Sequence, residues 1–248
     1  MVLVDVRTVT YNRRLRDLNN RIIDEYVDFV DSNLGTGVSS TPVNPADKYK
    51  DSIGACILGM FTVAFTANQS VDFQQSVYRV AEQEASSYVE TLRESFDNAY
   101  QRLDDVSIDA SAYKELRDSG ADILTTLNVK DEEHAKPYTE ISPLLIRNTF
   151  DNRVAMTQSL ADYTYFSNVL DYNGNPLYTE KYWIWSQAED TRHSEMDGET
   201  VFIDEMFVVT NEVTGEEDEG RFPRDYDNMS PSNAYNCLCD IGYLVDGH

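Results

Sequence analysis

Hydrophobic residues near the start of the chain recur at intervals of three and four positions, which is typical of one apolar face on an amphipathic helix. The residues with this spacing are Leu15, Leu18, Ile22, Tyr26 and Phe29. We therefore predict an N-terminal amphipathic helix over residues 1–34. Residues 35–45 contain several turn-forming residues and show no periodicity, so they are predicted to form a linker.

The region 46–141 is predicted to be helical. Its longest apolar pattern at helical spacing consists of Phe73, Val77, Ala81, Ala85, Tyr88, Leu92, Phe96, Ala99 and Leu103. A shorter helical pattern covers Ala110–Leu127. The apolar run Ile53–Ala67 spans about 15 residues, short of the roughly 20 that a membrane-spanning helix needs, so we expect a buried helix there and no membrane anchor.

The pattern changes within residues 142–248. A further helix is expected over Leu144–Leu170, and Asn173-Gly174 is a strong signal for a hairpin turn. Three stretches then read as strands, with sequences YWIW, TVFIDEMFVVT and NAYNCLCDIGYLV, and the acidic GEEDEG between the last two reads as a solvated hairpin tip. The predicted fold class is therefore α+β, with an elongated helical N-terminal region followed by a small β-rich C-terminal domain.

Charge sets this chain apart from an average globular protein. Its 248 residues carry 44 acids and 20 bases, a formal net charge of −24, and only six of the bases are lysines. Such a surface repels itself in dilute buffer and stays soluble in concentrated salt, which favours a halophilic protein over an ordinary acidic one. The excess of acid also argues against DNA binding over most of the surface.

The basic residues gather in one stretch near the N-terminus. Its arginines are Arg7, Arg13, Arg14, Arg16 and Arg21. The simpler interpretation is a solvated polar face on the first helix. The functional alternative is contact with packaged DNA or with an acidic partner, because a guanidinium group binds phosphate in a bidentate manner.

The stretch DTRHSEMDGETVF, residues 190–202, is the best candidate for chemistry, and we favour a structural turn there. In this interpretation Gly198 supplies a positive φ, Asp197 tolerates the left-handed region, and the turn joins two strands as a tight hairpin. Arg192 would fix the turn by pairing with a neighbouring carboxylate or with a backbone carbonyl.

A metal site is the alternative interpretation of the same stretch. His193, Cys237 and Cys239 offer an imidazole and two thiols, and zinc takes four such ligands in a tetrahedron. A Cys-x-Cys on a strand directs both side chains to one face. Candidates for the fourth ligand are Asp190, Glu195 and Asp197. Such partial sets are more often two buried thiols beside a turn histidine, so no cofactor is expected and zinc remains the alternative.

Enzymatic activity is not expected from this sequence. The acidic cluster Asp190–Glu199 could hold Mg²⁺ in a metal-dependent hydrolase or nuclease, but no matching motif accompanies it. No serine or cysteine is an evident nucleophile partner for a histidine base, and there is no glycine-rich phosphate loop. With three cysteines in all, a disulfide framework is excluded.

The order of pieces in the last hundred residues resembles a known family. These pieces are Arg147 and Asn148 in a helix, the segment Trp185–Phe202, and the closing segment Asn233–Val245. Over residues 144–245 this order is similar to the C-terminal domain of tailed-phage minor head proteins, the head-morphogenesis family that includes the Mu F-like proteins. Relatives often carry a Cys-x-x-Cys before the turn and a His-Pro-Asn before the final cysteines, and this chain has neither. The resemblance therefore does not carry a zinc site over to this chain.

The resemblance implies a structural virion protein without enzymatic activity. Such a protein lies inside the head near the portal, is made in the host cytoplasm, and helps head assembly or DNA delivery. Its expected partners are the viral portal and the major capsid protein, with packaged DNA as a further partner through the arginine stretch. Strong acidity fits a tailed virus of a halophilic archaeon. A cellular halophilic binding module is a third, weaker interpretation.

The charge analysis predicts that folding depends on salt. In molar KCl the Debye length falls to about 3 Å, so repulsion among the surface acids is screened. We expect the chain to be folded in molar KCl and unfolded in dilute buffer, as measured by far-ultraviolet circular dichroism across a KCl series. A melting temperature that is the same in low and molar salt would contradict the halophilic interpretation.

Overall fold

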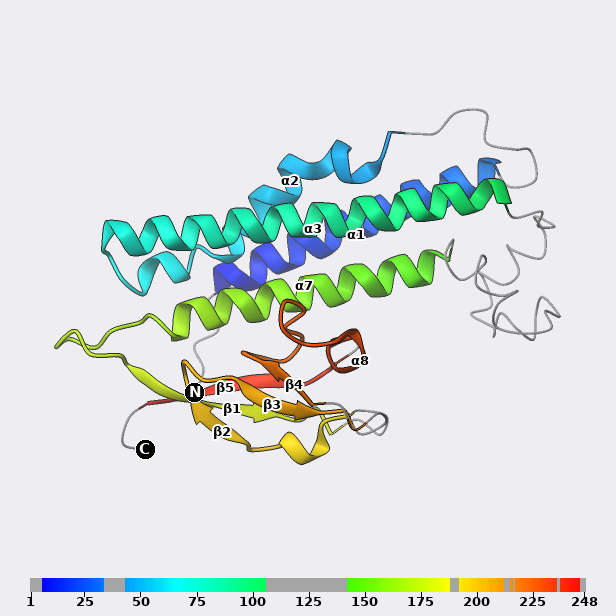
Figure 1. The fold of residues 1–248 in the computed structure, drawn as a ribbon. Coiled ribbons are helices and arrows are strands. Elements are labelled where there is room, and N and C mark those ends of the chain that lie inside the picture. The colour runs from blue at the N-terminus through cyan, green and yellow to red at the C-terminus, as the bar shows by residue number, and fades with distance from the viewer. Residues whose placement is uncertain are drawn as a thin grey trace. The chain divides into compact units, whose positions relative to one another are not determined.

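The computed structural model describes residues 6–33, 43–105, 142–187, 192–211, 215, 217–235 and 237–245, and for residues 6–9, 102, 104 and 105 it describes the backbone alone. The described part has long helices first and short strands last, which confirms the α+β class (Figure 1). The long helices are α1 (Val6–Asn33), α2 (Pro45–Met60), α3 (Val71–Asp105) and α7 (Pro143–Phe166). The helical pattern predicted at Ala110–Leu127 lies outside the described residues.

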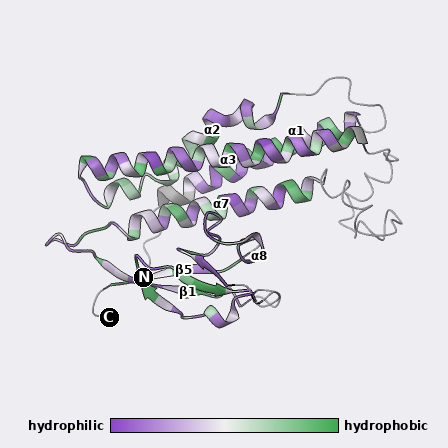
Figure 2. Cartoon of the chain, in the orientation of Figure 1, coloured by the Kyte–Doolittle hydropathy of each residue, from purple (hydrophilic) through white to green (hydrophobic). Residues whose placement is uncertain are grey.

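The apolar periodicity located the long helices well. Helix α1 lies within the predicted range 1–34, and four of the five residues that define its apolar face are buried. Hydrophobic and hydrophilic residues alternate along α1, α3 and α7 in Figure 2, as expected of amphipathic helices. No helix among the described residues is both long and apolar enough to cross a membrane.

The apolar run Ile53–Ala67 is not one helix, contrary to the prediction. Helix α2 ends at Met60, and a turn and a short 3₁₀ helix, η1 (Ala64–Thr66), follow it. Two threonines bond backwards to the main chain here: the hydroxyl of Thr62 donates to the Gly59 carbonyl at 2.6 Å and that of Thr66 to the Val63 carbonyl at 2.6 Å. Such local bonds compete with continued α-helix, so hydrophobicity alone overestimated its length.

The chain forms two compact units, each built from segments that are far apart in the sequence. Unit 1 comprises Met1–Arg14, Ala55–Ala85 and Asn152–His248, and unit 2 comprises Leu15–Gly54 and Ser86–Asp151. All four long helices, α1, α2, α3 and α7, contribute residues to both units. Periodicity locates helices without showing which parts of them pack together, so a division of this kind is not read from the sequence.

Unit 2 has an aromatic core. The ring of Phe96 lies 5.5 Å from that of Tyr26 and 5.8 Å from that of Phe150, which joins α3 to both α1 and α7. In the same unit the side-chain amide of Asn19 donates a 2.7 Å hydrogen bond to the Tyr88 hydroxyl, so this buried polar pair is satisfied.

Unit 1 contains the strands. In a three-stranded antiparallel sheet, β1 (Tyr178–Ile184) lies between β2 (Thr200–Phe202) and β5 (Asp240–Val245) (Figure 1). A separate antiparallel pair is formed by β3 (Phe207–Thr210) and β4 (Glu217–Gly220). The short helices η2 (Ser194–Met196) and α8 (Pro231–Ala234) complete the described elements.

Two of the predicted strands are wrong in extent. The stretch TVFIDEMFVVT is divided between β2 and β3, which belong to different sheets, because a turn follows Phe202 and the Glu205 amide donates to the Phe202 carbonyl at 3.0 Å. The stretch NAYNCLCDIGYLV contains α8, then an extended segment, then β5. The Asn173-Gly174 turn is present, with φ 85° at Gly174 and a bridge between Leu170 and Pro176.

A buried ion pair joins α3 to α7 within unit 1. The Arg153 guanidinium lies 2.9 Å from the Glu84 carboxylate, and the two side chains are 9% and 4% exposed. The Thr157 hydroxyl also donates to Glu84, at 2.6 Å. Burial raises the pKa of Glu84, while Arg153 and Thr157 oppose that shift. The carboxylate therefore depends on both neighbours to stay charged inside the protein.

Breaking this pair from one side is predicted to destabilise unit 1 strongly. Arg153→Met leaves a buried carboxylate without its cation, and we expect a loss of about 3–5 kcal/mol in the free energy of unfolding. The double variant Glu84→Leu/Arg153→Met should regain most of that loss, because the Thr157 hydroxyl also reaches the Arg153 backbone carbonyl at 2.8 Å. Urea denaturation in molar KCl measures both. Equal losses in the single and the double variant would contradict the prediction.

Candidate metal centre

The turn that contains Gly198 is fixed to the backbone of β1. The Trp183 amide donates to the Glu199 carbonyl and the Gly198 amide donates to the Trp183 carbonyl, both at 2.9 Å. The Asp197 carboxylate accepts a 3.0 Å bond from the Trp185 amide. The position of this turn relative to the sheet is therefore set by bonds to the main chain of Trp183 in β1 and of Trp185 just after it.

The turn is of type II, and it differs in detail from the predicted hairpin. Asp197 has φ −58° and ψ 116°, Gly198 has φ 80°, and the Glu199 amide donates to the Met196 carbonyl at 2.8 Å. Gly198 alone takes the positive φ, so Asp197 is not in the left-handed region. The turn follows η2 rather than a strand.

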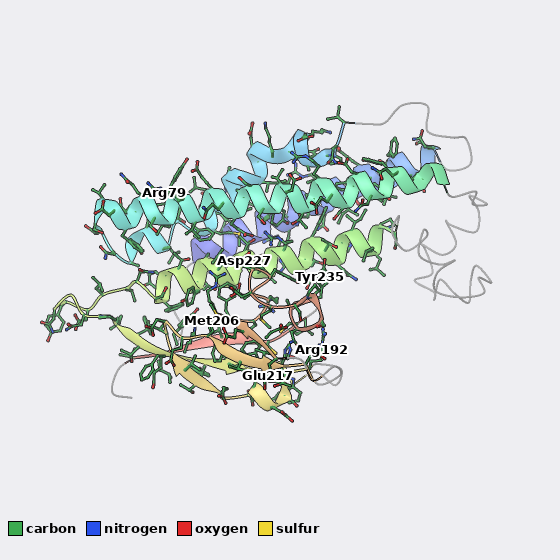
Figure 3. All side chains as sticks on the ribbon, viewed as in Figure 1. Arg79, Arg192, Met206, Glu217, Asp227 and Tyr235 are labelled. Carbon is green, nitrogen blue, oxygen red and sulfur yellow. The ribbon has the colours of Figure 1, made fainter. Side chains whose placement is uncertain are left out.

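Arg192 connects two distant parts of unit 1. Its guanidinium donates a 2.6 Å hydrogen bond to the backbone carbonyl of Tyr235, and both residues are labelled in Figure 3. The predicted backbone acceptor is therefore present, but it lies beyond α8 rather than in the Gly198 turn. Arg192 directly precedes His193, so this bond holds the start of the His193 segment against the segment that leads to the two cysteines.

His193, Cys237 and Cys239 meet in the interior of unit 1. The Nδ1 atom of His193 lies 3.6 Å from the sulfur of Cys237 and 3.9 Å from the sulfur of Cys239. All three potential ligand atoms lie within 4.8 Å of one another, and the residues are 2%, 5% and 1% exposed. The cysteines lie in the extended segment before β5, where the exposed Leu238 between them leaves both sulfurs on the buried side.

A chain of hydrogen bonds sets which nitrogen of His193 carries the proton. The Asp218 carboxylate accepts a 2.7 Å bond from the Asn233 side-chain amide, so the amide oxygen of Asn233 faces the imidazole. That oxygen lies 3.3 Å from Nε2 of His193 and can only accept. Nε2 therefore carries the hydrogen, and Nδ1 presents a lone pair to the two sulfurs.

Asp218 is suited to anchor this chain. Its carboxylate also accepts a 3.0 Å bond from the Ser230 amide and one from the Ser230 hydroxyl. Partial burial raises the pKa of Asp218, but the bonds from Ser230 and Asn233 outweigh it and leave the pKa below its ordinary value. The anchor is thus an ionised carboxylate, which can only accept hydrogen bonds.

The electrostatics of the two thiols are linked. A hydrogen bond from Cys237 lowers the pKa of Cys239 against the effect of burial. The hydrogen bond with Cys239, together with burial, raises the pKa of Cys237. The pair thus loses its first proton readily and its second with difficulty, and a bound cation would favour the loss of both.

The arrangement fits two kinds of chemistry, and burial separates them. An imidazole lone pair beside two thiols suits a soft divalent metal. A cysteine that contacts a histidine, which in turn contacts an asparagine, also suits nucleophilic catalysis. A nucleophile must reach a substrate, however, and sulfurs on residues that are 5% and 1% exposed have no such access. Metal binding is therefore the better match.

The other predicted site residues lie apart from this cluster. Glu195, Asp197 and Glu199 are exposed, and the His193, Cys237 and Cys239 set is the one metal-ligand group found among the described residues. Asp190 lies outside the described part of the chain.

The predicted arginines lie on α1. Arg13, Arg14, Arg16 and Arg21 are exposed, while the side chain of Arg7 lies outside the description. Within unit 1 the Arg14 guanidinium lies 5.2 Å from the ring centre of Tyr11, and within unit 2 Arg16 pairs with Asp151 at 3.1 Å. The stretch therefore has partners for some of its charge, and Arg13 and Arg21 remain exposed on the helix surface.

Sequence reasoning missed the two polar residues that orient His193. Asn233 was noted only as part of a motif, and Asp218 was assigned to a solvated hairpin tip. That assignment is wrong in its secondary structure, because Glu217, Asp218 and Glu219 all lie in β4, and wrong for Asp218 in its exposure, because this residue binds Ser230 and Asn233. Glu217 and Glu219 are exposed, as expected. The sequence held no signal for Asp218, because residues 217–220, EDEG, show no alternation of apolar and polar positions.

Comparisons of the chain with protein-family models, with curated proteins and with solved structures found no match in any of the three. Function must therefore be argued from the residues and their geometry.

The type II turn predicts a specific cost for a side chain at position 198. A Cβ on Gly198 would meet no heavy atom within 4 Å, so any loss comes from the φ of 80° alone. We expect Gly198→Val to lower the free energy of unfolding by about 1–3 kcal/mol, and Gly198→Asn to cost less because Asn tolerates positive φ. Thermal unfolding in molar KCl compares the two. A valine variant as stable as the asparagine variant would show that the turn relaxes.

Proposed function

We propose that this chain is a structural minor head protein of a tailed virus, located inside the head near the portal and acting in head assembly or DNA delivery. The proposal starts from the resemblance to the head-morphogenesis family. The observation that supports it most is that two of the three sequence pieces carrying this resemblance, although far apart in the chain, share one hydrophobic core in unit 1.

That core contains buried residues from the segment Trp185–Phe202 and from the closing segment Asn233–Val245. Its buried members are Trp183, Met196, Phe207, Val209, Met229, Ala234, Cys237 and Cys239. Met196 belongs to the segment Trp185–Phe202, while Ala234 and both cysteines belong to the closing segment. Pieces that pack together in this way constrain one another, so their order along the chain is more informative than any one of them. This supports treating the resemblance as one of fold and role.

The proposed partners are the portal and the major capsid protein, met in the host cytoplasm during assembly. Long amphipathic helices favour recognition by surface contact. Helix α3 alone has 35 residues, about 50 Å of helix. DNA contact, if the protein lies in the packaged head, would be confined to the exposed arginines of α1, because the excess of acid repels phosphate elsewhere.

A metal-dependent hydrolase is the second candidate, and the geometry supports it less. Phosphodiester cleavage needs carboxylates that converge on Mg²⁺. The described carboxylates of the 190–199 stretch do not form a ligand group, and Asp197 instead bonds to the Trp185 amide. A cellular halophilic binding module is the third candidate. Portal and capsid genes beside the coding sequence would favour the virion role over both.

The virion role predicts that the protein copurifies with particles. Full-length protein should be detected by mass spectrometry in nuclease-treated particles purified in molar salt, and it should resist external protease because it lies inside the head. The charge-reversal variant Arg13→Glu/Arg14→Glu/Arg21→Glu should remain folded but lose most of its incorporation. The matched control is Arg79→Glu, an exposed arginine on α3 labelled in Figure 3, which should be incorporated normally.

The outcomes separate the parts of the proposal. Absence of the wild-type protein from purified particles would reject the virion role. Normal incorporation of the triple variant would keep that role and reject docking through the arginines. Cleavage of DNA by the purified protein with Mg²⁺, reduced in Glu199→Gln, would support the hydrolase instead.

A further inference from the structure

We propose that His193, Cys237 and Cys239 form a structural zinc site that joins two segments of unit 1. The inference does not rest on the proposed virion role, since it follows from the distances, burial and hydrogen bonds of these residues. The ligands would be Nδ1 of His193 and the two sulfurs. A fourth coordination position would remain, which the described residues do not fill.

The distances between the ligand atoms match zinc geometry. Zinc–sulfur bonds of about 2.3 Å and zinc–nitrogen bonds of about 2.0–2.1 Å at a tetrahedral angle place the two ligand atoms about 3.6 Å apart. The observed Nδ1–sulfur distances are 3.6 and 3.9 Å. Both nitrogen–sulfur distances are therefore within a few tenths of an ångström of those in a zinc site.

The surroundings of His193 are those of a metal ligand. A ligating histidine usually donates its other ring N–H to an oxygen whose own position is fixed, and Asn233 held by Asp218 supplies that oxygen. His193 itself has φ 74°, a left-handed conformation that is uncommon outside glycine. The protein thus holds the His193 backbone in an unfavourable conformation, and in this conformation Nδ1 faces the two sulfurs.

The segments that carry the ligands are held in place by other contacts. Arg192 donates to the Tyr235 carbonyl at 2.6 Å, and Arg224 donates to the Cys237 carbonyl at 2.8 Å. These bonds lie on either side of the ligand set, so the site is largely formed before a metal arrives. Preorganisation of this kind favours tight binding.

If the cluster were only two buried thiols beside a turn histidine, with no metal, one feature would stay unexplained. The buried indole N–H of Trp183 has no hydrogen-bond partner among the described residues. The Trp183 ring centre lies 5.7 Å from that of His193. A thiolate bound to zinc would serve this N–H as a lasting acceptor. Zinc binding releases both thiol protons, and Zn²⁺ with two thiolates is neutral, which suits a buried site.

Zinc content and coordination test the site directly. Full-length protein, reduced and kept in molar KCl, should contain close to one zinc per chain by elemental analysis. The variants His193→Ala, Cys237→Ser and Cys239→Ser should lose it, while Cys56→Ser, which changes the third cysteine, should retain it. Cobalt-substituted protein should show thiolate-to-cobalt charge transfer and the intense d–d bands of tetrahedral cobalt.

A measurement on the wild-type chain guards against variants that fail to fold. Removing zinc with a chelator should lower the melting temperature, and adding zinc back should restore it. Zinc below about a tenth per chain after loading, an octahedral cobalt spectrum, or equal zinc in wild type and all three ligand variants would each overturn the proposal.

The hydrogen-bond chain makes Asp218 a positioning residue for the metal. Asp218→Asn removes the acceptor that fixes Asn233, and we expect zinc affinity to fall by about 10–100-fold in a competition with a chromogenic chelator. Glu219→Gln is the matched control, since Glu219 is the next residue in β4 and is exposed. Equal zinc affinities for Asp218→Asn and wild type would reject this role.

Discussion

Trp183 lies at the centre of unit 1, and the other features of that unit follow from its packing. Its backbone exchanges two hydrogen bonds with the turn at Gly198 and Glu199, while its fully buried indole packs edge-on against Phe207 at 5.3 Å and against His193 at 5.7 Å. One residue of β1 thus fixes the turn, the β3–β4 pair and the histidine. An aromatic side chain of this size buries enough apolar surface to make each of those contacts costly to break.

The acidic composition has two different consequences in this molecule. Most of the described acids lie on the surface, where salt screens them. A few are buried or partly buried and paired, and each of these organises a piece of structure. Asp225, fully buried, receives bonds from both Nε and Nη2 of Arg221 at 2.8 and 2.7 Å. Glu84 joins two helices through Arg153, and Asp218 orients the candidate metal ligand.

The two proposals concern different parts of the protein, the helical surface and the interior of the β-rich part. A virion role needs a stable fold and a surface for docking, and long amphipathic helices with exposed arginines could supply the surface. A zinc site would supply stability to the smaller β-rich part, whose two sheets have three and two strands. Sheets this small have limited cores, and structural zinc is a common way to strengthen such domains.

The sequence by itself determined the features that depend on near neighbours. Periodicity located α1 and α3, the aromatic run located β1, and the glycine in Asp197-Gly198 located a turn with positive φ. Each of these follows from interactions within a few residues, so a short stretch of sequence contains the information. Where a local signal competed with another, as at Thr62 after α2, hydrophobicity alone gave the wrong boundary.

Tertiary structure alone decided which of these elements meet. His193 and Cys237 are 44 residues apart, and whether their atoms lie 3.6 or 30 Å apart depends on every turn between them. The sequence could therefore name His193, Cys237 and Cys239 as candidate ligands without choosing between a metal site and a chance grouping. It gave Asp218 no role, because its carboxylate matters only when α8 presents Asn233 to it. Contacts of this kind depend on long-range packing, which no local pattern encodes.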